Sequence, residues 1–396
     1  MSDFISLNKQ DIFNPLQKVF GIVDRKNTMS ILANVLLEKN NGKLNLISTD
    51  TEIQISTSID AENADNEESI TINAKKFSDI LKSFRDDDNL LLDLDNDNER
   101  MHIKCGRSRF ALQTLPAEDF PKLELDEEDL NTLTLTQKEF KSLLKQTQYS
   151  IAVQDIRYYL NGLLLYVKEH KIVTVSTDGH RLAYAAKTIS ETLPTQDVII
   201  PRKTVLELIR LLPDDSKDIN ISISKSQIKF EFNDITIVSK VIDAKFPDYE
   251  AVFPKEFTTA VLVDRNEIIT AIQRVSIVSA DKSRGVSLSL SAGNLTLIAE
   301  NTEQEEAKED IEVEYNGEDF NIGFNVQYLL DVLTNMSCNQ VIFRFTNEDS
   351  SGLITSNEYS VEGEDLCNLP TESDGENESA EESKSYFRYV VMPMRI

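Results

Sequence analysis

Two hydrophobic patterns alternate along this chain, and the first is helical. In several stretches apolar residues recur three and four positions apart, which is typical of helices that bury one face. These stretches form two interleaved sets of three, at 7–23, 73–85, 136–149, 201–212, 264–278 and 325–337. Within each set, equivalent residues of neighbouring stretches, such as Leu7 and Leu135, lie 124 to 128 positions apart. Self-similarity at a nearly fixed interval over 396 residues predicts three similar domains.

The second pattern is an alternation of apolar and polar residues, which is typical of half-buried strands. The segment 44–49 alternates in this way and follows Asn41-Gly42, a frequent hairpin turn. Segments 172–177 and 295–299 occupy the equivalent places in the second and third repeats. Further strands are predicted at 89–94, 101–113, 219–223, 227–232, 235–241, 341–345 and 386–392. Helices mixed with hairpin-linked strands favour an α+β fold with antiparallel sheets.

A residue pair ending in proline closes each repeat. Phe120-Pro121 and Phe246-Pro247 are 126 residues apart, whereas Met392-Pro393 lies 146 residues beyond the second pair. The surplus falls in 360–385, which holds nine acidic residues and one lysine among Gly, Ser, Asn and Pro. Such a composition predicts a solvated loop rather than a packed element.

Domain boundaries follow from these markers. We predict a first domain at 1–127, a second at 128–254, and a third at 255–396 that contains the acidic loop 362–385. The acidic stretch 124–129 links the first domain to the second, and 253–256 links the second to the third.

Composition excludes several classes of protein. Hydrophobic residues make up 40% and charged residues 28%, as in soluble globular proteins. Three cysteines without a C-x-x-C pair indicate reduced structural thiols rather than a disulfide framework or a zinc site. The N-terminus has no signal-peptide pattern, and no apolar run approaches the roughly 18 residues that span a membrane. We expect a cytoplasmic protein with no membrane association.

The net charge of −27 argues against anionic partners, but only if the charge is evenly spread. The six helical stretches together carry +7, so the rest of the chain carries −34. The helices are thus the cationic part of an acidic protein. One explanation is a set of helices that faces an anion, and the other is the general preference of Lys and Arg for helix surfaces.

Motifs for catalysis or metal binding are scarce. The chain has no glycine-rich phosphate loop, no G-x-S-x-G and no H-E-x-x-H, and only three histidines (His102, His170 and His180). The pair Asp178 and His180 could be imagined as an acid and a base, but Asp178-Gly179 reads more simply as a turn. We therefore predict no catalytic residue, no metal site and no cofactor.

Several motifs resemble a known family in order along the chain. They are 106–110 (GRSRF), 157–162 (RYYLNG), 177–183 (TDGHRLA), 246–249 (FPDY), 303–307 (EQEEA), 323–325 (GFN) and 389–396 (YVVMPMRI). Together they are similar to the bacterial DNA polymerase III beta subunit, the sliding clamp family. The resemblance covers the whole chain apart from the loop near 362–385.

The resemblance implies a non-enzymatic processivity factor in DNA replication. Two chains, each with three domains of the DNA clamp fold, would form a head-to-tail ring-shaped homodimer, with helices lining a central hole for double-stranded DNA. Helix-borne cations contact phosphates without reading bases, so binding would be independent of sequence. The resemblance implies DNA-contact residues at Arg25, Lys26, Gln154, Tyr158, Tyr159, Arg202 and Lys203.

The resemblance also implies a hydrophobic groove that binds peptides from the replicative polymerase alpha subunit, the clamp loader and other repair and replication proteins. Flexible methionine thioethers suit a groove that accepts several partners. The implied groove residues are Leu160, Thr177, Gly179, His180, Arg181, Leu182, Pro247, Val252, Ser351, Val390, Val391, Met392, Pro393, Met394 and Arg395.

A seam between the two chains is implied as well, in which basic residues of one end face acidic residues of the other. The first end comprises Lys76, Ile80, Arg107 and Arg109. The second comprises Ile277, Val278, Glu303, Glu305, Glu306 and Glu309.

The chain departs from the family pattern at several positions. Glu250-Ala251 follow the FPDY motif where basic residues are common, and Asp349 and Gly352 stand where apolar residues are frequent. These departures concern the peptide preference of the groove. Two other functions stay open: an acidic scaffold that encircles nothing, and a hydrolase that uses Asp178 and His180.

Overall fold

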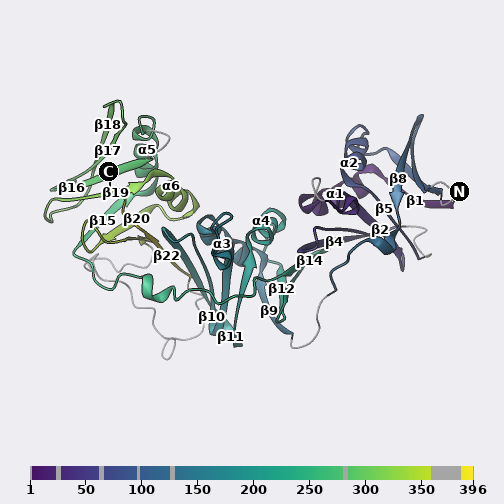
Figure 1. Cartoon of the computed structure of the whole chain (residues 1–396), viewed down its shortest axis with the longest axis horizontal. Coiled ribbons are helices and arrows are strands. Elements are labelled where there is room, and N and C mark those ends of the chain that lie inside the picture. Colours follow the sequence, from purple (N-terminus) through teal and green to yellow (C-terminus); the bar gives the residue numbers. More distant parts are fainter. Residues whose placement is uncertain are drawn as a thin grey trace. The chain divides into compact units, whose positions relative to one another are not determined.

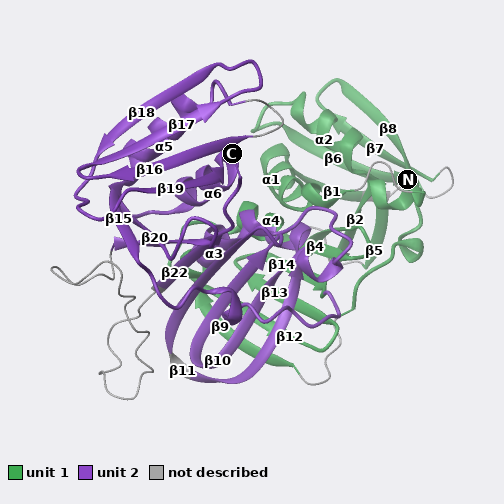
Figure 2. Ribbon diagram, turned by 60° about the vertical axis from the view of Figure 1, so that its left-hand side comes forward, with its two compact units in different colours: residues 1–141, 206–241 green, residues 142–205, 242–396 purple. Residues whose placement is uncertain are grey.

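The computed structural model describes residues 2–23, 28–61, 67–95, 99–124, 130–279, 284–357 and 385–395. The chain forms two compact units (Figures 1 and 2). Unit 1 comprises Met1–Lys141 and Leu206–Val241, and unit 2 comprises Ser142–Val205 and Ile242–Ile396. The division falls within the helices α3 (Gln137–Thr147) and α4 (Arg202–Leu211).

Unit 1 contains one antiparallel sheet and the helices α1 (Lys9–Val19) and α2 (Ala74–Lys82). The sheet order is β1-β6-β7-β8-β5-β2-β3-β4-β14-β13-β12-β9. Its strands are β1 Ser2–Asn8, β2 Asn34–Asn40, β3 Lys43–Thr49, β4 Ile53–Asp60, β5 Glu68–Asn73, β6 Asn89–Asp95, β7 Arg100–Cys105, β8 Ser108–Leu115, β9 Asn131–Thr136, β12 Asp218–Ile223, β13 Gln227–Phe232 and β14 Ile235–Lys240.

Unit 2 contains two antiparallel sheets and the helices α5 (Arg265–Val275) and α6 (Val326–Asn335). One sheet has the order β10-β11-β22-β21-β20-β15, and the other has the order β18-β17-β16-β19. The strands are β10 Gly162–Thr177, β11 Arg181–Pro201, β15 Thr259–Asp264, β16 Gly285–Ser291, β17 Asn294–Glu300, β18 Glu306–Glu312, β19 Phe320–Asn325, β20 Gln340–Phe345, β21 Gly352–Ser356 and β22 Ser385–Val391.

The threefold repeat predicted from the sequence is present in the backbone. The helices α1, α3 and α5 each follow a strand directly, and each begins 128 positions after the one before. In each, the N–H of the first helical residue donates to the carbonyl just before a strand: Lys9 to Asp88 at 2.8 Å, Gln137 to Lys217 at 2.8 Å, and Arg265 to Asn339 at 2.9 Å. The same strand–helix unit therefore occurs three times.

Apolar helix faces cover the sheets, as the helical spacing predicts. In unit 1, α1 buries Ile12, Leu16 and Val19 against β3 and β4. In unit 2, α5 buries Ile268 and Ile272 and contacts β17, β18 and α6. Burying one such side chain contributes about 1.5–3 kcal/mol relative to leaving it in water. The predicted α+β class with antiparallel sheets is confirmed.

Some predicted boundaries were wrong. The segment 101–113 forms two strands, β7 and β8, because the chain turns at Gly106, which has a φ of +54°. The helical stretches at 7, 136 and 264 were started one or two residues too early, because Leu7, Thr136 and Asp264 still belong to the strands β1, β9 and β15. The predicted acidic link at 125–129 and the acidic loop at 362–384 lie outside the described residues.

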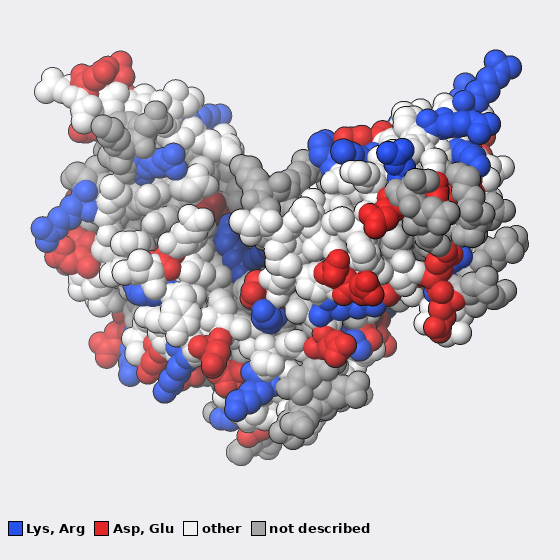
Figure 3. Space-filling view, turned by 45° about the vertical axis from the view of Figure 1, so that its right-hand side comes forward, with Lys and Arg blue, Asp and Glu red and all other residues white. Residues whose placement is uncertain are grey.

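None of the helices among the described residues is long and apolar enough to cross a membrane. Both signs of charge are interspersed on the face in Figure 3, where Lys and Arg side chains lie beside Asp and Glu.

The N-terminus of α5 provides a test of these local interactions. The Asp264 carboxylate accepts hydrogen bonds from the N–H groups of Asn266 and Glu267, both at 2.9 Å. We expect Asp264→Ala to cost about 1 kcal/mol and to speed hydrogen exchange of these two amides. Asn8 precedes α1 in the same position but makes no side-chain cap bond, so Asn8→Ala is the matched control. Equal losses in the two variants would contradict the assignment.

Candidate functional site

The tight turn between β10 and β11 is held by its own side chains. The Asp178 carboxylate accepts hydrogen bonds from the N–H groups of His180 (2.9 Å) and Arg181 (3.1 Å). The Thr177 hydroxyl accepts from the N–H of Gly179 at 3.1 Å and donates to the Arg181 carbonyl at 2.6 Å. Gly179 has a φ of +90°, and a Cβ there would lie 3.0 Å from the guanidinium of Arg157. Glycine therefore suits this position on both counts.

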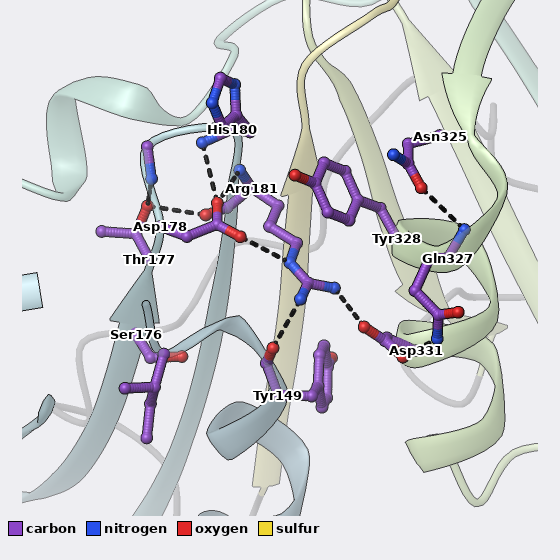
Figure 4. A network of polar contacts seen from close by, with 12 residues as sticks. Tyr149, Ser176, Thr177, Asp178, His180, Arg181, Asn325, Gln327, Tyr328 and Asp331 are labelled. Atoms are coloured by element: carbon purple, nitrogen blue, oxygen red, sulfur yellow. Dashed lines mark hydrogen bonds and ion pairs between the residues drawn. The ribbon is translucent and has the colours of Figure 1, made fainter. Parts of the chain in front are cut away.

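The guanidinium of Arg181 joins this turn to α6 (Figure 4). Its Nε donates to Asp178 at 3.0 Å, its Nη1 to Asp331 at 2.5 Å, and its Nη2 to the Tyr149 carbonyl at 2.7 Å. The guanidinium carbon lies 4.4 Å from the centre of the Tyr328 ring, within cation–π range. The guanidinium carbon also lies 5.9 Å from the centre of the Tyr149 ring, so three acceptors and two rings fix this half-buried cation.

Burial and charge act in opposite directions on this group. Burial alone would lower the pKa of Arg181, but the hydrogen bond to Asp331 and the charges of Asp178 and Asp331 more than offset that effect and raise the pKa above its ordinary value. Burial also raises the pKa of the Tyr149 and Tyr389 phenols, so both stay neutral. Arg181 therefore stays charged, paired with two carboxylates.

The C-terminal strand β22 lies between β11 and β21 in the six-stranded sheet. Arg181 pairs with Val391, and Gly352 on the other side pairs with the same residue. Beyond the strand, the N–H of Met392 donates to the His180 carbonyl at 2.9 Å, and that of Met394 donates to the Gly323 carbonyl at 2.7 Å. The chain end is thus fixed against the turn.

The residues implied for the groove all lie in unit 2, and we call them the peptide face. Leu182 and Val390 are buried in one apolar cluster. Met392 is 52% exposed and Val252 46% exposed. Buried members are Leu160, Leu182, Val390 and Val391; partly buried members are Thr177, Arg181, Ser351, Pro393 and Met394; exposed members are Gly179, His180, Pro247, Val252, Met392 and Arg395.

The implied DNA contacts that the structure describes lie on the loop before β10 and at the start of α4. Tyr158 is 58% exposed, Tyr159 is half-buried, and Gln154 is exposed with a φ of +54°. Arg202 donates from Nη1 to the Ile151 carbonyl at 3.3 Å, which brings the loop to the helix start. Lys203 is exposed. Arg25 and Lys26 lie outside the described residues.

The same loop presents apolar side chains while being braced internally. Ile156 is 97% exposed and Val153 69% exposed. The Asp155 carboxylate accepts from the Arg157 side chain at 3.0 Å and 2.8 Å and from its N–H at 2.8 Å. The Asn161 side chain donates to the Asp155 carbonyl at 2.8 Å and accepts from its N–H at 2.9 Å.

The implied seam residues lie at two separate places. In unit 1, Lys76 and Ile80 are on α2, and Arg107 and Arg109 are exposed at the β7–β8 turn. In unit 2, Ile277 follows α5 and is 83% exposed. Val278 lies beside Ile277, and the acidic members Glu303, Glu305, Glu306 and Glu309 lie on or just before β18.

Glu309 already has a partner within its own chain. Its carboxylate accepts from Nη1 of Arg274 at 2.5 Å. Arg274 and Glu309 also line a surface hollow between α5 and β18 with a volume of about 390 Å³. A partner's cation would share Glu309 with Arg274.

The hydrolase alternative does not fit the turn. The Asp178 carboxylate bonds to backbone N–H groups and to Arg181, and it orients no imidazole. Among the residues that the structure describes, no group of three His, Cys, Asp or Glu side chains could hold a metal ion.

Sequence reasoning missed the residues that hold these surfaces in place. Asp331 and Tyr149 reach Arg181 from 150 and 32 positions away, a separation that no local pattern reveals. Asp155 had a weak signal, because an Asp two residues before Arg157 can bond to its N–H.

The threefold strand–helix repeat with antiparallel sheets defines a DNA clamp fold. The chain matches the family model for the N-terminal domain of the DNA polymerase III beta subunit at 3–124, the central domain at 134–248 and the C-terminal domain at 250–364. The chain therefore belongs to the DNA polymerase III beta subunit family.

Individual relatives match over nearly their full length. A beta sliding clamp of Pseudomonas aeruginosa is 39% identical over 394 residues, 99% of each chain. The beta sliding clamp of Escherichia coli is 37% identical over 391 residues, again 99% of each. A crystal structure of a DnaN sliding clamp from Pseudomonas aeruginosa bound to griselimycin has a TM-score of 0.88 and 37% identity over 99% of both chains.

The braced loop predicts a pH effect. Hydrogen bonds from the Arg157 side chain and N–H lower the pKa of Asp155 from 3.8 to about 2. Because the folded pKa is lower, the stabilisation is present above the unfolded pKa and is lost as the pH falls from 3.8 through about 2.

NMR titration of the Asp155 carboxyl carbon should show a midpoint near pH 2. In Arg157→Ala it should move towards 3.8 without reaching it, because the backbone N–H remains. Arg157→Lys should fall between the two, since an ammonium lacks the planar fork. An unchanged midpoint in Arg157→Ala would rule out this explanation.

Proposed function

We propose that this chain is a DNA sliding clamp, a processivity factor that encircles duplex DNA and tethers the replicative polymerase. The observation that carries the proposal is the similarity to beta sliding clamps over 99% of the chain, together with a strand–helix unit in three copies. Such factors are non-catalytic, so we assign no reaction. We propose three clamp domains, at 1–127, 128–254 and 255–396, in a cytoplasmic protein.

DNA would be held loosely and without regard to sequence. Helical stretches with a net charge of +7 in a chain of −27 give weak attraction to phosphates, and the acidic remainder opposes tight adhesion. The proposed contacts are Gln154, Tyr158, Tyr159, Arg202 and Lys203, together with Arg25 and Lys26. Retention on DNA would then be topological, and it would raise the effective concentration of polymerase at the primer end.

Two chains would close a ring through unlike ends. Arg107 and Arg109 project from the β7–β8 turn, and β18 is an edge strand that carries Glu306 and Glu309. Unlike surfaces that join head to tail can form a closed ring, and opposite charges fix their register. Exposed Ile277 supplies an apolar contact beside the charges.

The peptide face would bind linear segments of the polymerase alpha subunit, the clamp loader and other repair and replication proteins. The buried apolar cluster that contains Leu182 and Val390 and the exposed side chains of Met392 and Val252 support this proposal, because thioethers adapt to different apolar side chains. Glu250 places an exposed charge two positions before Val252, and we expect it to affect which peptides this face prefers.

Encirclement of DNA is the property that distinguishes a sliding clamp from an acidic scaffold. After loading onto nicked circular DNA, the protein should stay bound through gel filtration, and it should be lost within minutes once a restriction enzyme cuts the circle. If a bound protein blocks both ends of the linear DNA, retention should be restored. Equal retention on circular and linear DNA would mean that the protein holds DNA by contact alone.

The peptide face can be tested by removing its edge. Deletion of 392–396 should abolish binding of a labelled polymerase alpha-subunit peptide, measured by fluorescence anisotropy, because Met392 and Met394 are lost. Sedimentation should still show a dimer of about twice 44.9 kDa. His180→Ala should weaken binding of the peptide without abolishing it. Full peptide binding by the truncated chain would exclude this face.

A further inference from the structure

The turn that edges the peptide face is tied to α6 through a continuous chain of contacts. At the start of α6, the Asn325 side chain accepts from the N–H of Gln327 at 2.8 Å. The Gln327 side chain then donates to Asp331 Oδ1 at 2.7 Å, and Asp331 Oδ2 accepts from Arg181. Figure 4 shows these side chains in sequence from the helix to the turn.

Of the residues in this series of contacts, Asp331 is the one whose loss should disturb the turn 178–180 most. Its carboxylate accepts the hydrogen bond from Nη1 of Arg181. The Asp178 carboxylate accepts from Nε of Arg181 and also from two backbone N–H groups of the turn. The side chain of Arg181 is 10% exposed and that of Asp331 22% exposed. With water largely excluded, the cation needs a second carboxylate or it draws Asp178 away from the backbone.

The turn 178–180 also positions the C-terminal segment at Met392. The His180 carbonyl accepts from the N–H of Met392, so a shift of the turn moves the methionine that edges the peptide face. Tyr328 lies under the guanidinium, and its carbonyl accepts from the Tyr389 hydroxyl at 3.0 Å, which ties β22 to the same helix. The turn, the helix and the strand therefore share one support.

We propose that Asp331 is a positioning residue for peptide binding, which acts through Arg181 to hold the turn 178–180 and Met392 in their binding geometry. This inference rests on the proposed function of the peptide face. In this arrangement Arg181 connects α6 to the turn, and each of its three side-chain nitrogens donates a hydrogen bond to an acceptor in the same chain.

The test compares variants of the full-length chain. We expect Asp331→Asn to weaken griselimycin binding about tenfold by isothermal titration calorimetry, the scale of one lost hydrogen bond to a charged group. Asp331→Glu, which keeps the carboxylate, should recover part of the loss. Gln327→Ala, which frees but does not remove Asp331, should give a smaller loss and serves if Asp331→Asn fails to fold.

A second readout needs no ligand. In Asp331→Asn, hydrogen exchange should accelerate at the amides of His180 and Met392 and stay unchanged at Leu288 and Leu297, which pair in the sheet of β16 and β17. Asp215→Asn is the matched control, because Asp215 forms an exposed ion pair with Lys217 in unit 1. It should change neither binding nor exchange at these positions.

The outcomes separate the two levels of the proposal. Wild-type affinity and wild-type exchange in Asp331→Asn would overturn the positioning role while leaving the peptide face intact. A loss of binding without faster exchange at His180 and Met392 would also overturn it. If the wild-type chain does not bind griselimycin, or binds it equally without 392–396, the peptide face itself fails.

Discussion

Each sheet in this protein depends on a helix that enters directly from one of its strands and covers its apolar face. In five such helices the first N–H donates to a carbonyl that directly precedes a strand; these carbonyls belong to Asp88, Asn161, Lys217, Arg284 and Asn339. The first N–H groups of a helix have no partner within it, so this bond satisfies one of them and fixes the helix to the sheet. Alternative packings of the helix would lose this bond.

The second constraint is a half-buried charge. Arg181 carries its guanidinium into a site lined by Tyr149, Tyr328 and Tyr389, and it is stable there because two carboxylates and a carbonyl accept its hydrogen bonds. Such a site stabilises a fold weakly compared with apolar packing, but it specifies geometry strictly. A surface that recognises peptides gains from that strictness, because its edge is then already in place before the peptide arrives.

Much of the fold could be predicted from the sequence, because the helices and several strands recur in three repeats and each repeat indicates the same kind of element. The strands β12, β13 and β14 and the cores of all six long helices were predicted close to their observed bounds. The turn at 106 was missed because Gly106 sits in an alternating segment with no second turn residue beside it. The candidate surfaces came from motif resemblance, whereas their supports did not, since Asp331 meets Arg181 only through tertiary structure.

The position of β22 in its sheet has a consequence for how the protein is made. This strand follows all the other described strands along the chain, yet it lies between β11 and β21. Until residues 385–391 leave the ribosome, the six-stranded sheet exists as two incomplete halves, β10–β11 and β15–β20–β21, each with an unpaired edge. Unpaired strand edges favour association with other chains. Unit 2 can therefore complete this sheet only after residues 385–391 have left the ribosome, and before that point a nascent chain is most open to mispairing with its neighbours on the same message.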